Sequence, residues 1–412
     1  MLKDIQVGWF LAYRQVKRSS IWTTSLIVFI MTLTFLNLVM TSGILVGLII
    51  GINQEFKTRL NGDLTVSPLD EKKQIEKTTE ILSLIRSNPD VTAYSTRYIE
   101  GATLEAGYKT RKDADEPNKV GAPLVGINPV QEDAFGGLSG KMIEGRFLET
   151  GDSDVMVLGK DLVEKYQADD NRPALKGVAT GDKIRVKIGD NTKEYTIVGI
   201  IQAKADVISG RAYMTEGEFL KFTGAVNYDA DEIGIKTTSD AAALALQRTL
   251  KENGYGQFAK IQTFEEGTPS FVKDIAALFG TLGNFFGSIG IVVASITLFI
   301  VVFINAVTRR KYIGILKGIG VSERAIEYAY VMQSFFYSVI GSSIGIIITF
   351  GLLVPFFEAN PIDFPFSDGI LVAPIDGTLI RMGILVFTAI VAGYIPAKMI
   401  VRQNTLNAIL GR

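Results

Sequence analysis

The stretch TTSLIVFIMTLTFLNLVMTSGILVGLII, residues 23–50, holds no charged residue along its whole length, and this indicates the fold class. The hydrocarbon core of a membrane is about 30 Å thick, and a helix of about 20 apolar residues crosses it. Similar windows follow at residues 285–307, 330–355 and 379–396, the last with Arg381 near enough to its start to reach the interface. Buried helices of a soluble protein are the alternative, but four such windows are hard to hide in soluble cores. The sequence therefore predicts a membrane α-helical bundle of four transmembrane helices.

The tail before the first window is predicted to form an amphipathic helix. Ile5, Trp9, Tyr13 and Val16 recur at helical spacing, with Lys and Arg residues beside them. This pattern is typical of a helix that lies on the inner membrane surface. A cytoplasmic extension of the first span is the alternative. A cleaved signal peptide is disfavoured, because a signal core has only about 7–15 apolar residues.

The charges of the loops predict the orientation. The N-terminal tail, the segment after the second window and the C-terminal tail are rich in Lys and Arg. In the loop at 356–377, by contrast, all charged residues are acidic. We therefore expect a multi-pass protein of the cytoplasmic (inner) membrane with both termini in the cytoplasm. The expected parts are a cytoplasmic amphipathic helix (1–20), span 1 (21–52), an extracytoplasmic domain (53–275), span 2 (276–308), a cytoplasmic coupling loop or helix (309–328), span 3 (329–355), an extracytoplasmic loop (356–377), span 4 (378–397) and a cytoplasmic tail (398–412).

The large insertion between the first two spans has the pattern of an α+β domain. GDLTVSP and DEIGIKTT predict short strands, and DKIRVKIGDNTKEYTIVGII predicts a β-hairpin that turns at 189–191. TTEILSLIRSNPDV and DAAALALQRTLKENG have helical apolar spacing and end in Asn-Pro and Asn-Gly. The polar stretch at 108–121 predicts a loop between two subregions.

The composition excludes several kinds of chemistry. The 412 residues contain 42 Lys and Arg and 43 Asp and Glu, so nothing favours nucleic acid as a partner. There is no cysteine and no histidine, which excludes disulfides, thiol nucleophiles, Cys/His zinc sites and Ser-His-Asp triads. No GxxxxGK[ST] motif occurs, and the acidic clusters at 113–116 and 151–154 lack calcium-loop spacing. We expect a chain with no catalytic, metal or cofactor site of its own.

Glycines recur at every fourth position in three of the predicted spans. This spacing lets helix backbones approach closely, within one bundle or between two copies, although ordinary membrane glycine usage is the alternative. The residues are Gly43, Gly47, Gly51, Gly283, Gly287, Gly341 and Gly345.

Several motifs together resemble one family. RRKYIGILKGIGVSERAI at 309–326, the following GSSIG at 341–345 and the closing AGYIPAKMIVRQNTLNAI at 392–409 are similar to the MacB/FtsX/LolC-type ABC transporter permeases, the mechanotransmission-like type VII. GINPVQEDAFGGLSGKMIEGRFLETGDSDVMVLGKDLVEKY at 126–166 resembles their MacB-like extracytoplasmic domain. Two positions depart from the family pattern: Tyr312 and Gln333 stand where an acidic residue is often found.

The resemblance implies a dimeric, non-catalytic permease subunit that works with a separate cytoplasmic ABC ATPase, which binds ATP and Mg. Motion of the ATPase would reach the extracytoplasmic domain and drive export or release of a lipoprotein, peptide or amphiphilic compound. Ile315, Leu316 and Ile319 are expected to offer an apolar knob to the ATPase, with basic residues beside it; for these basic residues, topology alone is the alternative. The expected coupling residues are Arg309, Arg310, Lys311, Ile313, Gly314, Ile315, Leu316, Lys317, Gly318, Ile319 and Gly320.

Other roles and partners stay open. The expected second permease copy can be identical to this chain or only related to it. The expected external partner is either a periplasmic adaptor or an extracytoplasmic substrate protein. An FtsX-like signalling subunit that regulates a cell-wall hydrolase or a sensor is the alternative function. A secondary carrier is disfavoured, because no charged residue lies deep in any predicted span.

Overall fold

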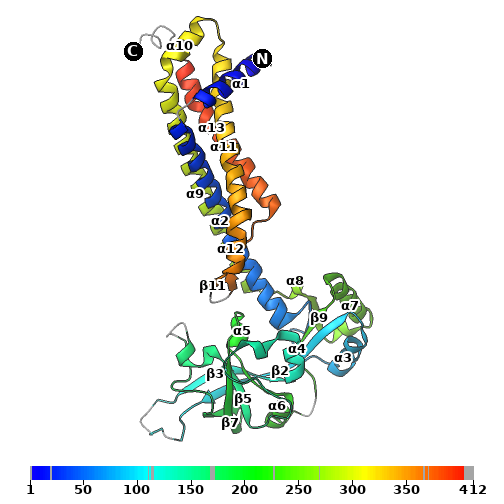
Figure 1. Cartoon of the computed structure of the whole chain (residues 1–412). Helices are drawn as coiled ribbons and strands as arrows, with labels where there is room; N and C mark the ends of the chain where they lie inside the picture. Colours follow the sequence, from blue (N-terminus) through cyan, green and yellow to red (C-terminus); the bar gives the residue numbers. More distant parts are fainter. Residues whose placement is uncertain are drawn as a thin grey trace. The chain divides into compact units, whose positions relative to one another are not determined.

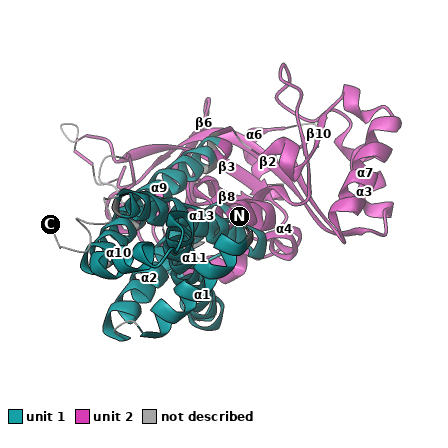
Figure 2. Ribbon diagram, turned by 90° about the horizontal axis from the view of Figure 1, so that it is seen from above, with its two compact units in different colours: residues 1–49, 274–363, 368–412 teal, residues 50–273, 364–367 magenta. Residues whose placement is uncertain are grey.

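The computed structural model describes residues 2–18, 21–109, 111–112, 116–167, 172–225, 228–268, 270–364, 367–369 and 371–402. The chain divides into two compact units, coloured separately in Figure 2. The helical unit contains residues 1–49, 274–363 and 368–412, and the sheet unit contains residues 50–273 and 364–367.

Four long apolar helices form most of the helical unit and run side by side (Figure 1). Each is long and apolar enough to cross a membrane. The predicted fold class is confirmed: four candidate membrane helices, with an α+β domain inserted after the first. The helices are α2 (Ile21–Phe56), α9 (Ser270–Thr308), α11 (Glu323–Ile348) and α13 (Ile375–Val401); α11 is prolonged by a π-helical turn (Thr349–Leu353) and α12 (Val354–Ala359).

The four helices pack through a shared apolar cluster. Met31 of α2, Val302 of α9 and Tyr330 of α11 are buried in it, together with Ala389 and neighbouring residues of α13. Phe35 and Leu38 of α2 form a second cluster with Leu385 of α13. Because lipid is as apolar as these side chains, close packing is what holds the helices together.

Small residues allow this close approach. A Cβ added to Gly341 of α11 would lie 2.5 Å from Met31 Cβ, and one added to Gly345 would lie 2.4 Å from Phe35 Cδ1. On α9, the Cβ of a residue at Gly283 would lie 3.3 Å from Leu45 Cδ1 of α2, and one at Gly287 would lie 3.7 Å from Leu38 Cδ2. These four glycines therefore face α2 within the chain.

The predicted glycines of α2 lie nearer its far end. A Cβ on Gly43 would lie 2.7 Å from Leu371 Cδ1, in the segment just before α13. Gly47 is buried and Gly51 is half-buried. Here too the structure brings the backbone of α2 close to another part of the chain.

The amphipathic tail forms helix α1 (Leu2–Arg18), which packs on α11. Trp9 and Tyr13, which the prediction places toward the membrane surface, are exposed, and the residues of α1 that are buried against the protein are Gly8 and Ala12. A Cβ on Gly8 would lie 2.7 Å from Tyr328 Cβ, so the backbones of α1 and α11 cross closely. The small residues allow this close crossing, and the Trp9 ring adds a contact with Phe336 of α11.

The sheet unit is built on one mixed sheet, which has ten strands among the described residues. Its order is β10-β1-β9-β2-β3-β8-β5-β7-β4, and β6 pairs with β2 and β7. The pairs β3–β8 and β5–β7 are parallel and the other pairs are antiparallel. The strands are β1 (Leu64–Ser67), β2 (Val91–Glu105), β3 (Lys119–Ile127), β4 (Met142–Gly145), β5 (Val155–Gly159), β6 (Lys183–Ile188), β7 (Asn191–Ile201), β8 (Ala212–Thr215), β9 (Glu232–Thr237) and β10 (Lys260–Thr263).

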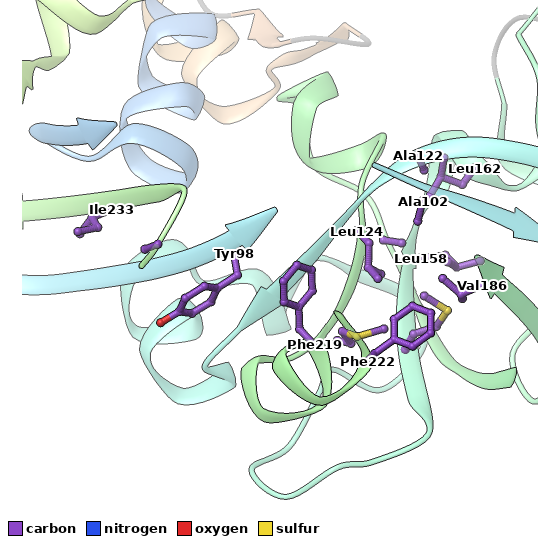
Figure 3. Packing of buried hydrophobic residues seen from close by; sticks show 14 of the residues in the cluster. Tyr98, Ala102, Ala122, Leu124, Leu158, Leu162, Val186, Phe219, Phe222 and Ile233 are labelled. Carbon is purple, nitrogen blue, oxygen red and sulfur yellow. The ribbon is translucent and has the colours of Figure 1, made fainter. Parts of the chain in front are cut away.

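Short helices cover this sheet and close its core. In Figure 3, Phe219 and Phe222 of α6 lie against Leu124 and Leu158 of the strands, and all four are buried. The helices are α3 (Thr78–Ser87), α4 (Pro129–Gly136), α5 (Asp206–Ser209), α6 (Glu216–Thr223), α7 (Asp240–Glu252) and α8 (Phe264–Gly267), with 3₁₀ turns at Leu138–Lys141, Lys160–Leu162, Glu164–Tyr166 and Tyr255–Gln257. A two-stranded pair, β11 (Ile362–Phe364) and β12 (Ser367–Gly369), lies between α12 and α13.

The predicted strands β1, β6, β7 and β9 and the predicted helices α3 and α7 are confirmed. The hairpin β6–β7 turns at 189–190, where Gly189 adopts a φ of 55° that favours glycine. The interpretation of 108–121 is wrong. Strands β2 and β3 pair from Arg97–Ile127 to Glu105–Lys119, so this segment closes a hairpin within one sheet instead of separating two subregions. Residues 110 and 113–115 lie outside the described residues.

Candidate functional site

The predicted coupling stretch forms helix α10 (Arg310–Gly318) between α9 and α11. Arg309 stands at its N-terminal boundary, and the helix ends before Ile319. Gly320 follows with a φ of 93°, a conformation that side chains rarely adopt, so the chain can reverse there. Ser322 then precedes α11 as its N-cap residue, and its hydroxyl accepts a hydrogen bond from the Ala325 amide at 3.2 Å.

One face of α10 is part of the helical bundle. Ile313 is buried in the cluster shared by α2, α9, α11 and α13, and Leu316 packs against that cluster. Gly314 is buried beside them. Leu316 is thus an anchor of α10 and does not share the exposed apolar surface with Ile315 and Ile319.

The opposite face of α10 is open. Tyr312, Ile315 and Ile319 are 70%, 50% and 73% exposed, and their spacing of three and four places them on one side of the helix. We call these three residues the outer face of α10. Lys311 is also exposed, and Arg309 and Arg310 are half-buried. Large apolar side chains beside basic ones make this the kind of surface that another protein covers.

Lys317 ties α10 to two other helices. Its side chain is 11% exposed, and Nζ lies 2.7 Å from Glu323 Oε1 in the first turn of α11. Nζ also donates to the Val401 carbonyl at 2.9 Å, at the last residue of α13. A lysine at this position is favourable, because the last carbonyls of a helix lack partners within the helix. Movement of α10 would therefore reach the ends of both α11 and α13.

Helix α1 is bonded to Ser322 and to α11, close to the end of α10. The Ser322 hydroxyl donates to Asp4 Oδ1 at 2.6 Å, and this bond lowers the pKa of the Asp4 carboxyl. The rings of Trp9 and Phe336 have centroids 4.9 Å apart, and the Gln333 amide donates to Gln15 Oε1. Gln333, one of the two departures from the family pattern, thus holds α1 on α11.

The predicted coupling residues lie together in and beside α10, but they do different things. Gly318 and Gly320 have no atoms within 4 Å of an added Cβ, so they border open space. Tyr312 is not among the predicted coupling residues, although its helical spacing from Ile315 and Ile319 is visible in the sequence. Nothing in the sequence indicates the bond of Ser322 to Asp4 or the bond of Lys317 to the Val401 carbonyl, because each joins residues far apart in the chain.

No described set of three or more acidic residues is arranged to hold a metal ion. In the acidic cluster at 151–154, Asp152 pairs with Arg146 at 2.7 Å and Asp154 pairs with Lys193 at 2.6 Å. The cluster at 113–116 lies largely outside the described residues.

Comparison with known proteins identifies the family. Residues 284–405 match the FtsX-like permease C-terminal domain, and residues 24–253, more than half of the chain, match the MacB-like periplasmic core domain. The chain belongs to the MacB/FtsX-type ABC transporter permeases. It is therefore a membrane protein, and an ATPase partner is implied in general terms for such permeases.

Two relatives are ABC transporter permeases. YtrF of Bacillus subtilis is 27% identical over 251 residues, which are 56% of this chain and 54% of YtrF. The uncharacterized permease MJ1507 of Methanocaldococcus jannaschii is 24% identical over 281 residues, which are 65% of each chain. The chain thus matches about half of YtrF and somewhat less than two thirds of MJ1507.

Two solved structures have similarity to part of the chain. The periplasmic region of MacB from Actinobacillus actinomycetemcomitans has a TM-score of 0.36 and 17% identity, covering 51% of this chain and 92% of that one. The extracellular domain of the noncanonic ABC-type transporter YknZ from Gram-positive bacteria has a TM-score of 0.34 and 15% identity, covering 48% and 98%.

Proposed function

We propose that this permease receives motion from a separate cytoplasmic ABC ATPase at the outer face of α10 and passes it to the sheet unit. The observation that carries the proposal is the two-sidedness of α10. Tyr312, Ile315 and Ile319 are exposed, whereas Ile313 and Leu316 belong to the bundle and Lys317 is bonded to the ends of α11 and α13. A force on the outer face would therefore act on the transmembrane helices through the contacts of Ile313, Leu316 and Lys317.

The rest of the proposal follows from the family and from the loop charges. The chain lies in the cytoplasmic membrane with α1, α10 and both termini inside and the sheet unit outside. It acts as a homodimer or heterodimer, has no cofactor of its own, and depends on ATP and Mg bound by the ATPase. Its work is export or release of a lipoprotein, peptide or amphiphilic compound, with an adaptor or a substrate protein outside the membrane.

A second candidate is an FtsX-like signalling subunit, with which the match of residues 284–405 to the FtsX-like permease C-terminal domain is compatible. In that case the sheet unit would control a cell-wall hydrolase or a sensor instead of moving a cargo. Crosslinking of the sheet unit in whole cells separates the two, because an enzyme or a sensor would be captured in one case and an adaptor or a cargo in the other.

The coupling proposal is tested by placing charge on the outer face. I315D and I319D each put a carboxylate where an apolar contact is expected, and neither side chain is needed for the bundle. We expect at least tenfold weaker association with the ATPase in nanodiscs and loss of the permease-dependent change in ATP hydrolysis. L244D is the matched control, because Leu244 is also exposed but lies on α7 of the sheet unit.

Normal association and normal hydrolysis in both outer-face variants, with wild-type thermal stability, would show that α10 is not the docking surface. K317M adds an independent check on transmission. It removes the links to Glu323 and Val401 while leaving the outer face intact. The ATPase should still bind, but its hydrolysis should no longer respond to the permease; K311M, which changes an exposed lysine of the same helix, should leave both unchanged.

A further inference from the structure

Helix α2 ends inside the sheet unit in an unusual way. After Phe56 the chain forms a π-helical turn (Lys57–Asn61), and the last turn of any helix leaves carbonyl groups without partners in the helix. Gly62 then takes a φ of 74°, where an added Cβ would lie 2.3 Å from the Ile235 carbonyl oxygen. The helix end is thus pressed against strand β9 without room for a side chain.

A fully buried arginine closes this helix end. The Arg97 side chain, from strand β2, is 1% exposed. Its Nη1 donates to the Leu60 carbonyl at 2.6 Å, and its Nη2 donates to the Arg59 carbonyl at 3.2 Å. The rigid fork of a guanidinium fixes both the distance and the rotation of the carbonyls that it binds. A lysine or an apolar residue could not hold two carbonyls in this way.

The charge of Arg97 is balanced by two carboxylates on other elements. Nη2 lies 2.7 Å from Glu132 Oε1 of α4, and Nη1 lies 2.6 Å from Glu232 Oε1 of β9. Arg211 lies 3.3 Å from the other oxygen of Glu232, so two positive and two negative groups meet. Burial by itself would raise the pKa of Glu232, but Arg211 and Arg97 outweigh it and leave that pKa lowered.

A second arginine, Arg59 of the π-helical turn at the end of α2, also binds α4. Arg59 pairs with Glu55 at 2.8 Å, one turn back in α2, and donates to the Gly136 carbonyl at 2.6 Å. Arg97 and Arg59 therefore bind the two ends of α4 together with the end of α2. If these charges served only to stabilise the domain, well-packed apolar residues would do as well or better. What they add is a defined position of the helix end relative to β2, β9 and α4.

We propose that Arg97 is a positioning residue that makes the sheet unit follow each rotation or axial shift of helix α2. This inference rests on the proposed function, in which the first span delivers motion to the sheet unit. Residues 57–62, Arg97 and Glu132 are called the joint. The bonds of Arg97 are buried or partly buried, and they join strand β2 to the end of α2, to α4 and to β9.

The test separates the joint from the stability of the domain. R97M/E132Q removes the fork and its main counter-charge together, and Glu232 keeps Arg211 as its partner. R146M/D152N is the matched control, because Arg146 and Asp152 also form two bonds, at 2.7 and 2.9 Å, but do not touch α2. R97K keeps the buried charge and loses the fork, so it gives an answer if the double variant does not fold.

The first measurement is hydrogen exchange of the full-length chain in nanodiscs. We expect the amides of residues 57–62 to exchange at least tenfold faster in R97M/E132Q and about threefold faster in R97K, with β2 and β9 protected as before. The control should match the wild type. Exchange at 57–62 within twofold of wild type, or equal acceleration across the whole sheet, would show that Arg97 does not fix the helix end specifically.

The second measurement follows motion. The chain has no cysteine, so D190C on the exposed β6–β7 turn gives a single site for a spin label. With the ATPase bound, we expect the ATP-dependent change in label environment to persist in the control and to fall at least fivefold in R97M/E132Q. Persistence of the full change in the double variant overturns the role of Arg97 alone. Absence of the change in the wild type overturns the proposed function itself, and with it any motion for Arg97 to transmit.

Discussion

Asp231 offers a test of the electrostatics beside the joint. Its Oδ2 accepts the Ile99 amide at 2.7 Å, yet burial raises the pKa of this carboxyl to about 6, from an ordinary value of 3.8, and Glu100 and Glu232 add to the rise. The folded chain therefore holds the proton more tightly than the unfolded chain does. Stability from this group is present below pH 4 and is lost as the pH rises through about 6.

The size of this loss follows from the two pKa values. A difference of about two in pKa corresponds to about 3 kcal/mol. Because Asp231 is only half-buried, water screens part of the effect, and we expect about 1–2 kcal/mol. In D231N the amide cannot ionise. The free energy of unfolding of the variant, relative to that of the wild type, should therefore rise by this amount between pH 4 and pH 7.

The assay is calorimetric or denaturant unfolding of the sheet unit in the full-length chain, at pH values from 4 to 7.5. The quantity to compare is the difference in free energy of unfolding between D231N and wild type at each pH, which removes any constant offset. D190N, at an exposed turn, is the control for the loss of a carboxylate elsewhere in the sheet unit. A flat difference for D231N, or one that grows toward acid, would contradict the assigned burial of this carboxylate.

Two further predictions concern glycines. G345A should lower stability in detergent by about 1–3 kcal/mol, because the new methyl group would lie 2.4 Å from Phe35, whereas G351A, with nothing within 4 Å, should be close to neutral in a thermal scan. G62A and G177A both place alanine at a positive φ, of 74° and 62°. G177A should cost about 1–2 kcal/mol for the backbone alone. G62A should cost at least about 3 kcal/mol by adding the clash with Ile235. Equal losses within a pair, in the thermal scan for G345A and G351A or in denaturant unfolding for G62A and G177A, would refute the contact.

Much of the fold was predictable, because membrane spans and hairpins have local signals. A window of about 20 apolar residues is sufficient to indicate a span. The hairpin β6–β7 follows from alternation of buried residues on either side of Gly189-Asp190. The role of the segment 108–121 does not follow from its sequence, since a polar run looks the same whether it joins two paired strands or two subregions. Pairing of β2 with β3 is a tertiary fact.

The candidate site was predictable as a stretch but not as a surface. Its helix, its basic residues and the cap at Ser322 follow from local sequence. The division of α10 into an exposed face and an anchored face does not, because Ile315 and Leu316 are neighbours of the same chemical type. Only the position of the bundle decides that Leu316 packs and that Ile315 stays open.

The membrane class, the order of spans and inserted domain, and the family follow from the amino-acid sequence, because hydropathy and short motifs are properties of contiguous residues. Only the folded chain shows which distant residues meet. Lys317 meets Val401, and Arg97 meets the carbonyls of Arg59 and Leu60, across long separations in the chain. Such contacts depend on backbone groups and buried charges, which leave no pattern in sequence, because the residues that form them are far apart in the chain.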